Sequence, residues 1–384
     1  MDKQRKTKLI QLVLFIVTVI TTTLAGSEWM LNKYLVIGMT WDDFVAGFSF
    51  SIPFLGILTV HEFGHYFTAK YHQIKVSLPY YIPLWFGFIL SPSIGTMGAF
   101  IRIRENIDSR LKYFDVGVSG PIAGFVMALV VLFYGFTNLP PQDYIYEIHP
   151  EYAEFSSVDQ AIEEMDGFTI RLGGNLLFNF FKEYVADPAM LPHEKEMMHY
   201  PWLLAGYLAL FFTALNLLPI GQLDGGHVLF GLFGAKNHAR ISRYLFTGFI
   251  FYASLGWVTI HDLNDTSLSG LADFLISIAI YIGVIYISAY SVFKEKKDRL
   301  LFATVLLAAQ FLVNLFTGWV GYQGWLLFGV LIGRFLGVDH PPAYDNRELT
   351  FGRKVIGWIA LIIFILCFSP QPLIVDFPST LETP

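Results

Sequence analysis

Long apolar runs recur along the whole chain, and they limit what it can fold into more than any other feature. A helix that crosses a bilayer needs about 20 predominantly apolar residues. Runs of about this length lie at 9–26, 44–69, 115–137, 201–219, 244–260, 271–292, 300–317, 319–337 and 355–371. The sequence therefore predicts an all-α polytopic membrane protein, embedded in a lipid bilayer, with about nine transmembrane helices.

The composition supports this prediction and excludes other classes of protein. Only 15% of the residues are charged, whereas soluble domains are about 25% charged. A hydrophobic content of 54% excludes intrinsic disorder. The single cysteine, Cys367, excludes a disulfide scaffold. The net charge of −6 argues against nucleic acid as a partner.

The charges of the loops predict how the helices are oriented, because Lys and Arg concentrate in cytoplasmic loops. Basic residues cluster at 3–8, 70–114, 236–243, 294–299 and 347–354, whereas the segments 27–43 and 138–200 are acidic. This alternation agrees with nine spans, a cytoplasmic N-terminus and a C-terminus outside. A cleaved signal peptide is the alternative for the first run. It is disfavoured because Thr23, Leu24 and Ala25 form a poor cleavage site and the apolar run is long.

Two loops are more than simple connectors. Residues 95–103 alternate between small or polar and apolar residues, which predicts a short strand or hairpin. Such a small membrane-associated β segment must be shielded from lipid. Residues 138–200 form a small extracytoplasmic cap at most. We expect three blocks: an N-terminal helix with its outer loop (1–43), a membrane core (44–243) and additional transmembrane helices (244–384).

The core carries His61, Glu62 and His65 in the pattern H-E-x-x-H within the apolar run at 44–69. Residues four apart share a helix face, so both imidazoles can bind one metal ion. Zinc suits two neutral imidazoles and a carboxylate. Glu62 can then take a proton from water that the metal activates. The alternative is that the histidines are polar residues at the cytoplasmic mouth, but ionisable residues in a membrane helix are functional candidates by default.

A second motif follows the apolar run at 201–219 and runs from Asn216 to Gly226. Pro219 and the glycines interrupt regular helix, which membrane proteins tolerate where the backbone lines a cavity or packs on protein. Asp224 could supply the one further carboxylate that a zinc site with two histidines needs. By itself Asp224 would fit an Asp-Gly turn better. The predicted orientation puts His61 and Asp224 on the same, cytoplasmic side.

These two motifs together resemble the site-2 protease family of intramembrane zinc metalloproteases. That family is marked by H-E-x-x-H in one span and N-x-x-P-x-x-x-L-D-G-G near the end of a later one. Asn216, Pro219 and the residues 223–226 match the second motif in full. The resemblance extends over about 50–240 and is closest to the branch without a PDZ domain, for which 138–200 is too short. The C-terminal spans have no counterpart in the family's core.

The resemblance implies zinc ligands at His61, His65 and Asp224 and a catalytic base at Glu62. It also implies a polar supporting role for Asn216, as a donor to the substrate carbonyl or the developing oxyanion. The implied reaction is hydrolysis of peptide bonds in transmembrane segments of single-pass membrane proteins, as in regulated intramembrane proteolysis.

A helical substrate must unwind before it is cut, because its backbone groups are paired within the helix. The segment 95–103, with Gly98 and Ala99, could hold the unwound stretch by edge pairing. The absence of a plastid transit peptide favours a bacterial inner membrane, with the site facing the cytoplasm.

Two other functions stay open. One is a catalytically silent membrane scaffold or chaperone, against which the intact Glu62 argues. The other is a metal-ion or solute transporter, which would spread its ionisable residues along a path across several spans. In this chain the ionisable residues cluster at one depth instead.

Overall fold

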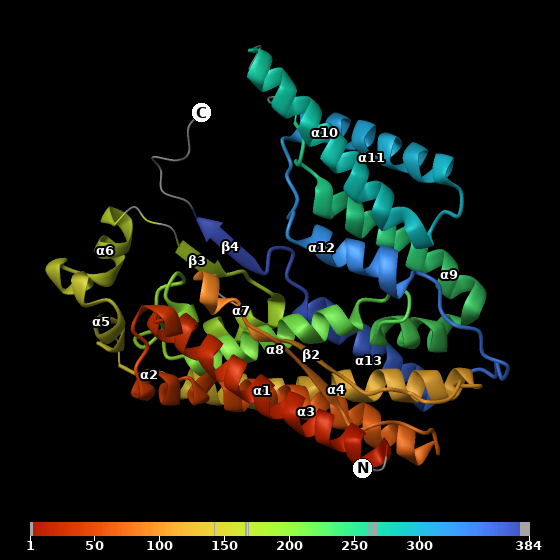
Figure 1. Ribbon diagram of the computed structural model, residues 1–384, viewed down its shortest axis with the longest axis horizontal. Helices are drawn as coiled ribbons and strands as arrows, with labels where there is room; N and C mark the ends of the chain where they lie inside the picture. Colours follow the sequence, from red (N-terminus) through yellow and green to blue (C-terminus); the bar gives the residue numbers. More distant parts are fainter. Residues whose placement is uncertain are drawn as a thin grey trace. The chain divides into compact units, whose positions relative to one another are not determined.

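The computed structural model describes residues 3–376 except 92, 142, 166, 168, 260, 261 and 263–266, and it is mainly helical (Figure 1). Within this part, five helices are long and apolar enough to cross a membrane: Gln4–Leu31, Trp41–Tyr71, Arg110–Thr137, Leu268–Ser291 and Lys296–Thr317. Pro201–Leu217 and Trp325–Leu336 are shorter apolar helices. The membrane class is thus supported, whereas nine spans and the orientation stay predictions. Residue 260 of the run predicted over 244–260 lies outside the described residues.

The chain divides into two compact units. The first comprises Met1–Ile107, Val118–Asn216 and Ile362–Pro384, and the second comprises Asp108–Gly117 and Leu217–Leu361. Three helices contribute to both units, namely α4 (Arg110–Thr137), α8 (Pro201–Leu217) and α13 (Phe351–Cys367). The blocks 1–43, 44–243 and 244–384 stay predictions.

The first unit contains the N-terminal helices and both small sheets. Its elements are α1 (Lys3–Leu31), α2 (Trp41–Ala46), α3 (Phe48–Tyr71), β1 (Tyr80–Leu84), β2 (Gly95–Phe100), α5 (Tyr144–Ile148), α6 (Val158–Glu164), β3 (Thr169–Leu172), α7 (Leu176–Tyr184), α8 (Pro201–Leu217, to Asn216) and β4 (Leu373–Asp376). The strand predicted within 95–103 is present as β2, which pairs antiparallel with β1. Strand β3 pairs antiparallel with β4, close to the C-terminus.

The hairpin of β1 and β2 packs on α1 and α3 (Figure 1). Polar side chains that interrupt the apolar run of α1 explain how the hairpin is held. Gln11 donates to the carbonyl oxygen of Leu78 at 2.6 Å, and Thr21 donates to that of Gly95 at 2.7 Å. These bonds satisfy backbone groups that would otherwise be costly at membrane depth.

The second unit is built mainly from the C-terminal helices. They are α9 (Asp224–Ser254), α10 (Leu268–Ser288), α11 (Lys296–Thr317), α12 (Trp325–Val330) and a π-helical turn (Leu331–Leu336). Helix α9 is interrupted at Gly234, which has φ 73° and ψ 173°. Gln310 of α11 donates to the carbonyl of Phe251 at 2.8 Å and to Ser254 Oγ at 2.7 Å, which fastens α11 to α9.

Candidate metal centre

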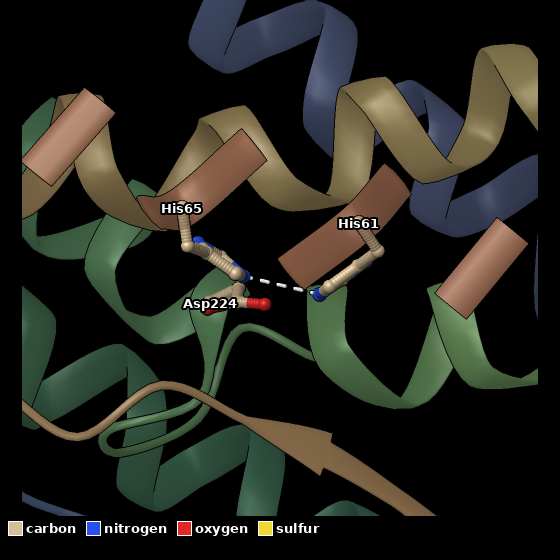
Figure 2. A group of neighbouring side chains, drawn as sticks. All are labelled: His61, His65 and Asp224. Atoms are coloured by element: carbon tan, nitrogen blue, oxygen red, sulfur yellow. Dashed lines mark hydrogen bonds between the residues drawn. The ribbon is translucent and has the colours of Figure 1, made fainter. Parts of the chain in front are cut away.

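His61, Glu62 and His65 lie on α3, and all three are buried, with exposed fractions of 5%, 4% and 7%. Because the histidines are four residues apart, both imidazoles project from one face of the helix. Their Nε2 atoms are 3.0 Å apart (Figure 2). Glu62 Oε1 lies 4.0 Å from His61 Nε2. The helix thus brings two ring nitrogens and a carboxylate together inside the protein.

Glycines of α4 leave room for the two imidazoles. A Cβ atom on Gly120 would lie 2.1 Å from His65 Nε2, and one on Gly124 would lie 3.0 Å from His61 Cβ. Ser119 of the same turn donates to the carbonyl oxygen of Gly64 at 3.1 Å. Small residues allow membrane helices to approach closely, and at these positions they also make the cradle for the histidine rings.

Asn216 and a small cavity also lie next to His61. Asn216 Nδ2 is 3.4 Å from His61 Nε2. The cavity has a volume of about 20 Å³ and is lined by His61, Asn216, Phe54 and Thr213 among others. This volume is sufficient for about one water molecule.

The hairpin is fixed to the turn of α3 that leads into His61. Thr59 Oγ1 and the Tyr81 hydroxyl share a hydrogen bond of 2.7 Å. Tyr81 pairs with Ala99 across the hairpin and packs against Leu55 and Leu58 of α3. Strand β2 therefore lies beside the helix that carries the histidines.

Strand β2 contains a bulge at the residues that the sequence analysis selects for substrate binding. The register shifts between Tyr81 and Pro83 of β1. Gly98 has φ +106°, and its N–H donates to Thr96 Oγ1 at 3.0 Å. Few residues other than glycine adopt this backbone conformation. The bulge turns Met97 outward, with an exposed fraction of 59%.

Asp224 is the first residue of α9 and belongs to the second unit. The turn before it is tight, with Gly221 at φ +61° donating its N–H to Ser242 Oγ at 2.9 Å. A Cβ atom on Gly225 would lie 1.9 Å from the carbonyl oxygen of Leu217. The glycine after the aspartate is thus required by the close approach of the end of α8 to the first turn of α9. The same turn fixes the position of Asp224 at the start of α9.

A second histidine pair lies in the same unit as Asp224. His227 Nδ1 and His340 Nε2 are 2.7 Å apart, and the His340 ring stacks on Phe230 with a centroid distance of 3.8 Å. Burial, with a smaller effect of His227, lowers the pKa of His340 to about 3. Arg243 donates to Asp339 at 2.9 Å. These contacts dock the segment 339–342 onto α9.

The arrangement on α3 fits a zinc ion. Tetrahedral zinc with Zn–N bonds of 2.0–2.1 Å holds two nitrogens about 3.3 Å apart. The separation of 3.0 Å between His61 and His65 is close to this value. Imidazole nitrogens and a carboxylate are also the donors that zinc prefers. The residues present could therefore hold the metal that the sequence predicts.

The sequence analysis missed a second cluster of residues that could hold a metal ion, formed by His149, Glu196 and His199 of the first unit. Glu196 and His199 have the spacing E-x-x-H, which places ligands near each other at metal sites in helix bundles. This spacing is the one local signal, because His149 is far away along the chain.

The model of peptidase family M50 matches residues 49–255 of this chain. Among curated proteins, the chain is similar to "Probable zinc metalloprotease EGY2, chloroplastic" of Oryza sativa subsp. indica, with 30% identity over 186 residues. It is also similar to "Probable zinc metalloprotease EGY1, chloroplastic" of Arabidopsis thaliana, with 29% identity over 184 residues. Each match covers 48% of this chain and 29% of the relative.

"Probable zinc metallopeptidase EGY3, chloroplastic" of Arabidopsis thaliana matches over a longer stretch. The identity is 25% over 228 residues, which are 58% of this chain and 36% of the relative. The chain thus spans about a third of the length of these relatives. No solved structure matches the chain.

Proposed function

This chain belongs to peptidase family M50, the site-2 protease family, and we propose that it is an intramembrane zinc metalloprotease. Its reaction would be hydrolysis of peptide bonds in transmembrane segments of single-pass membrane proteins, as a step of regulated intramembrane proteolysis. One observation carries the proposal. His61, Glu62 and His65 are buried together on a helix that is long and apolar enough to span a membrane. Ionisable residues at such a position are costly, which makes them candidates for a functional site.

In this proposal zinc is held by His61, His65 and Asp224, the side chains drawn in Figure 2. Each of the three offers one ligand atom. Two imidazoles and one carboxylate are a common catalytic zinc set, which leaves one position open for water or substrate. The family's second motif supports Asp224 as the third ligand, and the printed names of the relatives support zinc as the metal.

The chemistry is divided between the metal and the chain's own residues. Zinc bound there would lower the pKa of water and polarise the scissile carbonyl. Glu62 accepts the proton of the attacking water and delivers it to the nitrogen of the departing amine. Asn216 Nδ2 donates to the carbonyl oxygen of the substrate as negative charge develops on it. The cavity of about 20 Å³ beside His61 gives a water molecule a place within the helices.

We place the substrate along β2, by pairing of its unwound backbone with the edge of the strand. The sheet of β1 and β2 has two strands, so β2 has one edge that β1 does not occupy. Ala99 packs against Leu55 and Leu58 of α3, and Gly98 precedes it in β2. Edge pairing gives affinity through main-chain hydrogen bonds and accepts many sequences.

The protein is a membrane protein, and we place its site toward the cytoplasm. The support is the basic charge of the loops 70–114 and 236–243. The relatives are named as chloroplastic. The expectation of a bacterial inner membrane therefore rests on the sequence analysis alone.

The test compares the wild type with Glu62→Gln, both purified in detergent. Bound zinc is measured by mass spectrometry, and cleavage is measured on a panel of single-pass membrane proteins. We expect zinc in both proteins, with cleavage by the wild type only and its loss on chelation. Loss of the base should slow cleavage by about 10²- to 10⁴-fold.

Two outcomes would contradict the proposal. Equal cleavage by Glu62→Gln would remove Glu62 from its role as the base. Wild-type protein that transports zinc across proteoliposomes without cleaving any substrate would favour the transporter function instead.

A further inference from the structure

The segment between α4 and α8 contains three potential metal ligands at one point. His149 follows α5, while Glu196 precedes the short 3-10 helix Met197–His199 and His199 is its last residue. Their ligand atoms all lie within 4.8 Å of one another. His149 Nε2 is 3.4 Å from His199 Nε2 and 3.7 Å from Glu196 Oε2, and His199 Nε2 is 3.4 Å from Glu196 Oε2.

The outer contacts of both histidines decide which ring nitrogen carries the hydrogen. His199 Nδ1 lies 2.8 Å from the carbonyl oxygen of Met30, which can only accept, so Nδ1 is the donor. His149 Nδ1 lies 2.9 Å from the carboxylate of Glu151, so this nitrogen is also the donor. In the neutral rings, both Nε2 atoms therefore carry no hydrogen, and their lone pairs point into the cluster. Metal-binding histidines are oriented in this way by carbonyls and carboxylates.

A hydrogen bond also orients the carboxylate of Glu196. The hydroxyl of Tyr152 donates to Glu196 Oε1 at 3.0 Å. Glu196 Oε2 faces the two histidines and has no hydrogen-bond partner among the described residues. The residue is 4% exposed. A buried carboxylate oxygen without a donor is costly, because its hydrogen bonds to water are lost on burial and no hydrogen bond within the protein replaces them.

Three acceptor atoms thus converge, and one cation bound between them would satisfy all three together. The separations of 3.4, 3.4 and 3.7 Å match a metal better than a direct hydrogen bond. Tetrahedral zinc with bonds of 2.0–2.2 Å places its ligands about 3.3–3.6 Å apart. We propose that His149, Glu196 and His199 form a second zinc site, separate from the site on α3.

The surroundings indicate a site that keeps its fourth position for water. A cavity of about 350 Å³ is lined by all three ligands and also by Trp29 and Tyr34. Through the bond from His199 to Met30, the metal would join the extramembrane segment to the end of α1. The zinc therefore fastens this segment, and it does so whether or not the site on α3 is a protease.

The experiment counts zinc in the full-length protein and in matched variants. The double variant His61→Ala/His65→Ala silences the site on α3, and zinc is then titrated into the purified, metal-free protein. We expect this double variant to bind one zinc ion and the wild type to bind two.

Two further changes in the same background test the cluster. Glu196→Gln, which removes a ligand, should weaken zinc binding at least about 100-fold. Glu151→Gln, which only loosens His149, should weaken it about 10- to 100-fold. His193→Gln is the control, because His193 lies in the same segment but outside the cluster.

A measurement of thermal stability accompanies the titration, because a ligand that binds the folded protein raises its melting temperature. Zinc should raise the melting temperature of the His61→Ala/His65→Ala protein and should not raise that of the same protein with Glu196→Gln. Glu151 is on the exposed side of the cluster, so Glu151→Gln tests the site without risk to the buried core. The proposal is overturned if the double variant binds no zinc, or if Glu196→Gln, Glu151→Gln and His193→Gln bind it equally.

Discussion

Replacing Gly120 by alanine should remove the metal from α3 without changing any proposed ligand. The added Cβ atom would lie 2.1 Å from His65 Nε2, and ordinary contact begins at 3.4 Å. The ring must therefore move by about 1.3 Å, or α4 must move away from α3. Zinc–ligand distances tolerate only about 0.2 Å. A displacement of this size should cost about 100-fold or more in cleavage, and about 1–3 kcal/mol in stability through overpacking.

The assay measures zinc content and substrate cleavage for the Gly120→Ala protein and for a matched control. Gly56→Ala is that control, because Gly56 lies on α3 and its added Cβ atom would meet nothing within 4 Å. We expect Gly120→Ala to lose zinc and cleavage, and Gly56→Ala to keep both. Size-exclusion profiles of both proteins establish that they are folded.

The reasoning would be refuted by a folded Gly120→Ala protein with full zinc content and wild-type cleavage. In that case α4 would adjust without disturbing His65, and the glycine would serve helix packing alone.

Two further predictions follow from strain and from burial. Gly98→Val places a β-branched residue at φ +106°, which costs about 1–3 kcal/mol of stability, and cleavage should fall at least tenfold with zinc content unchanged. The control Gly318→Val, at φ +67° after α11, should leave cleavage intact. Equal effects of the two changes on cleavage would exclude a special role for β2. Burial lowers the pKa of His340, which faces His227 and His238, to about 3, so below the ordinary histidine pKa of about 6.5 the unfolded chain binds a proton that the folded chain does not. The free energy of unfolding of the metal-free protein should therefore fall by about 2 kcal/mol between pH 6.5 and 5. If acidification lowers the melting temperatures of the wild type and His340→Leu equally, this reasoning is contradicted.

The sequence by itself determined the class of protein and the local motifs. Apolar runs of membrane length follow from the cost of exposing backbone and charge to lipid, and α1, α4, α10 and α11 lie where the runs predicted them. Hydropathy reports lipid contact rather than helicity. For this reason the run predicted from 244 misses the first part of α9, which begins at Asp224 and carries basic residues.

The H-E-x-x-H pattern was readable because four residues make about one helical turn, so the sequence alone places His61 and His65 on one face. Alternation of small and apolar residues likewise predicted β2. In contrast, nothing in the sequence showed that Gly120 touches the ring of His65, because this contact depends on how α4 packs on α3.

Only the tertiary structure decided the second cluster. His149 and Glu196 are far apart in the chain, and α6, β3 and α7 lie between them, so no periodicity relates the two side chains. Their convergence depends on the fold of the whole segment, together with the hydrogen bonds that orient each ligand: Glu151 and Met30 accept from the histidines, and Tyr152 donates to Glu196. Local spacing encodes a site that one helix presents, whereas a site assembled from distant loops exists only after the chain has folded.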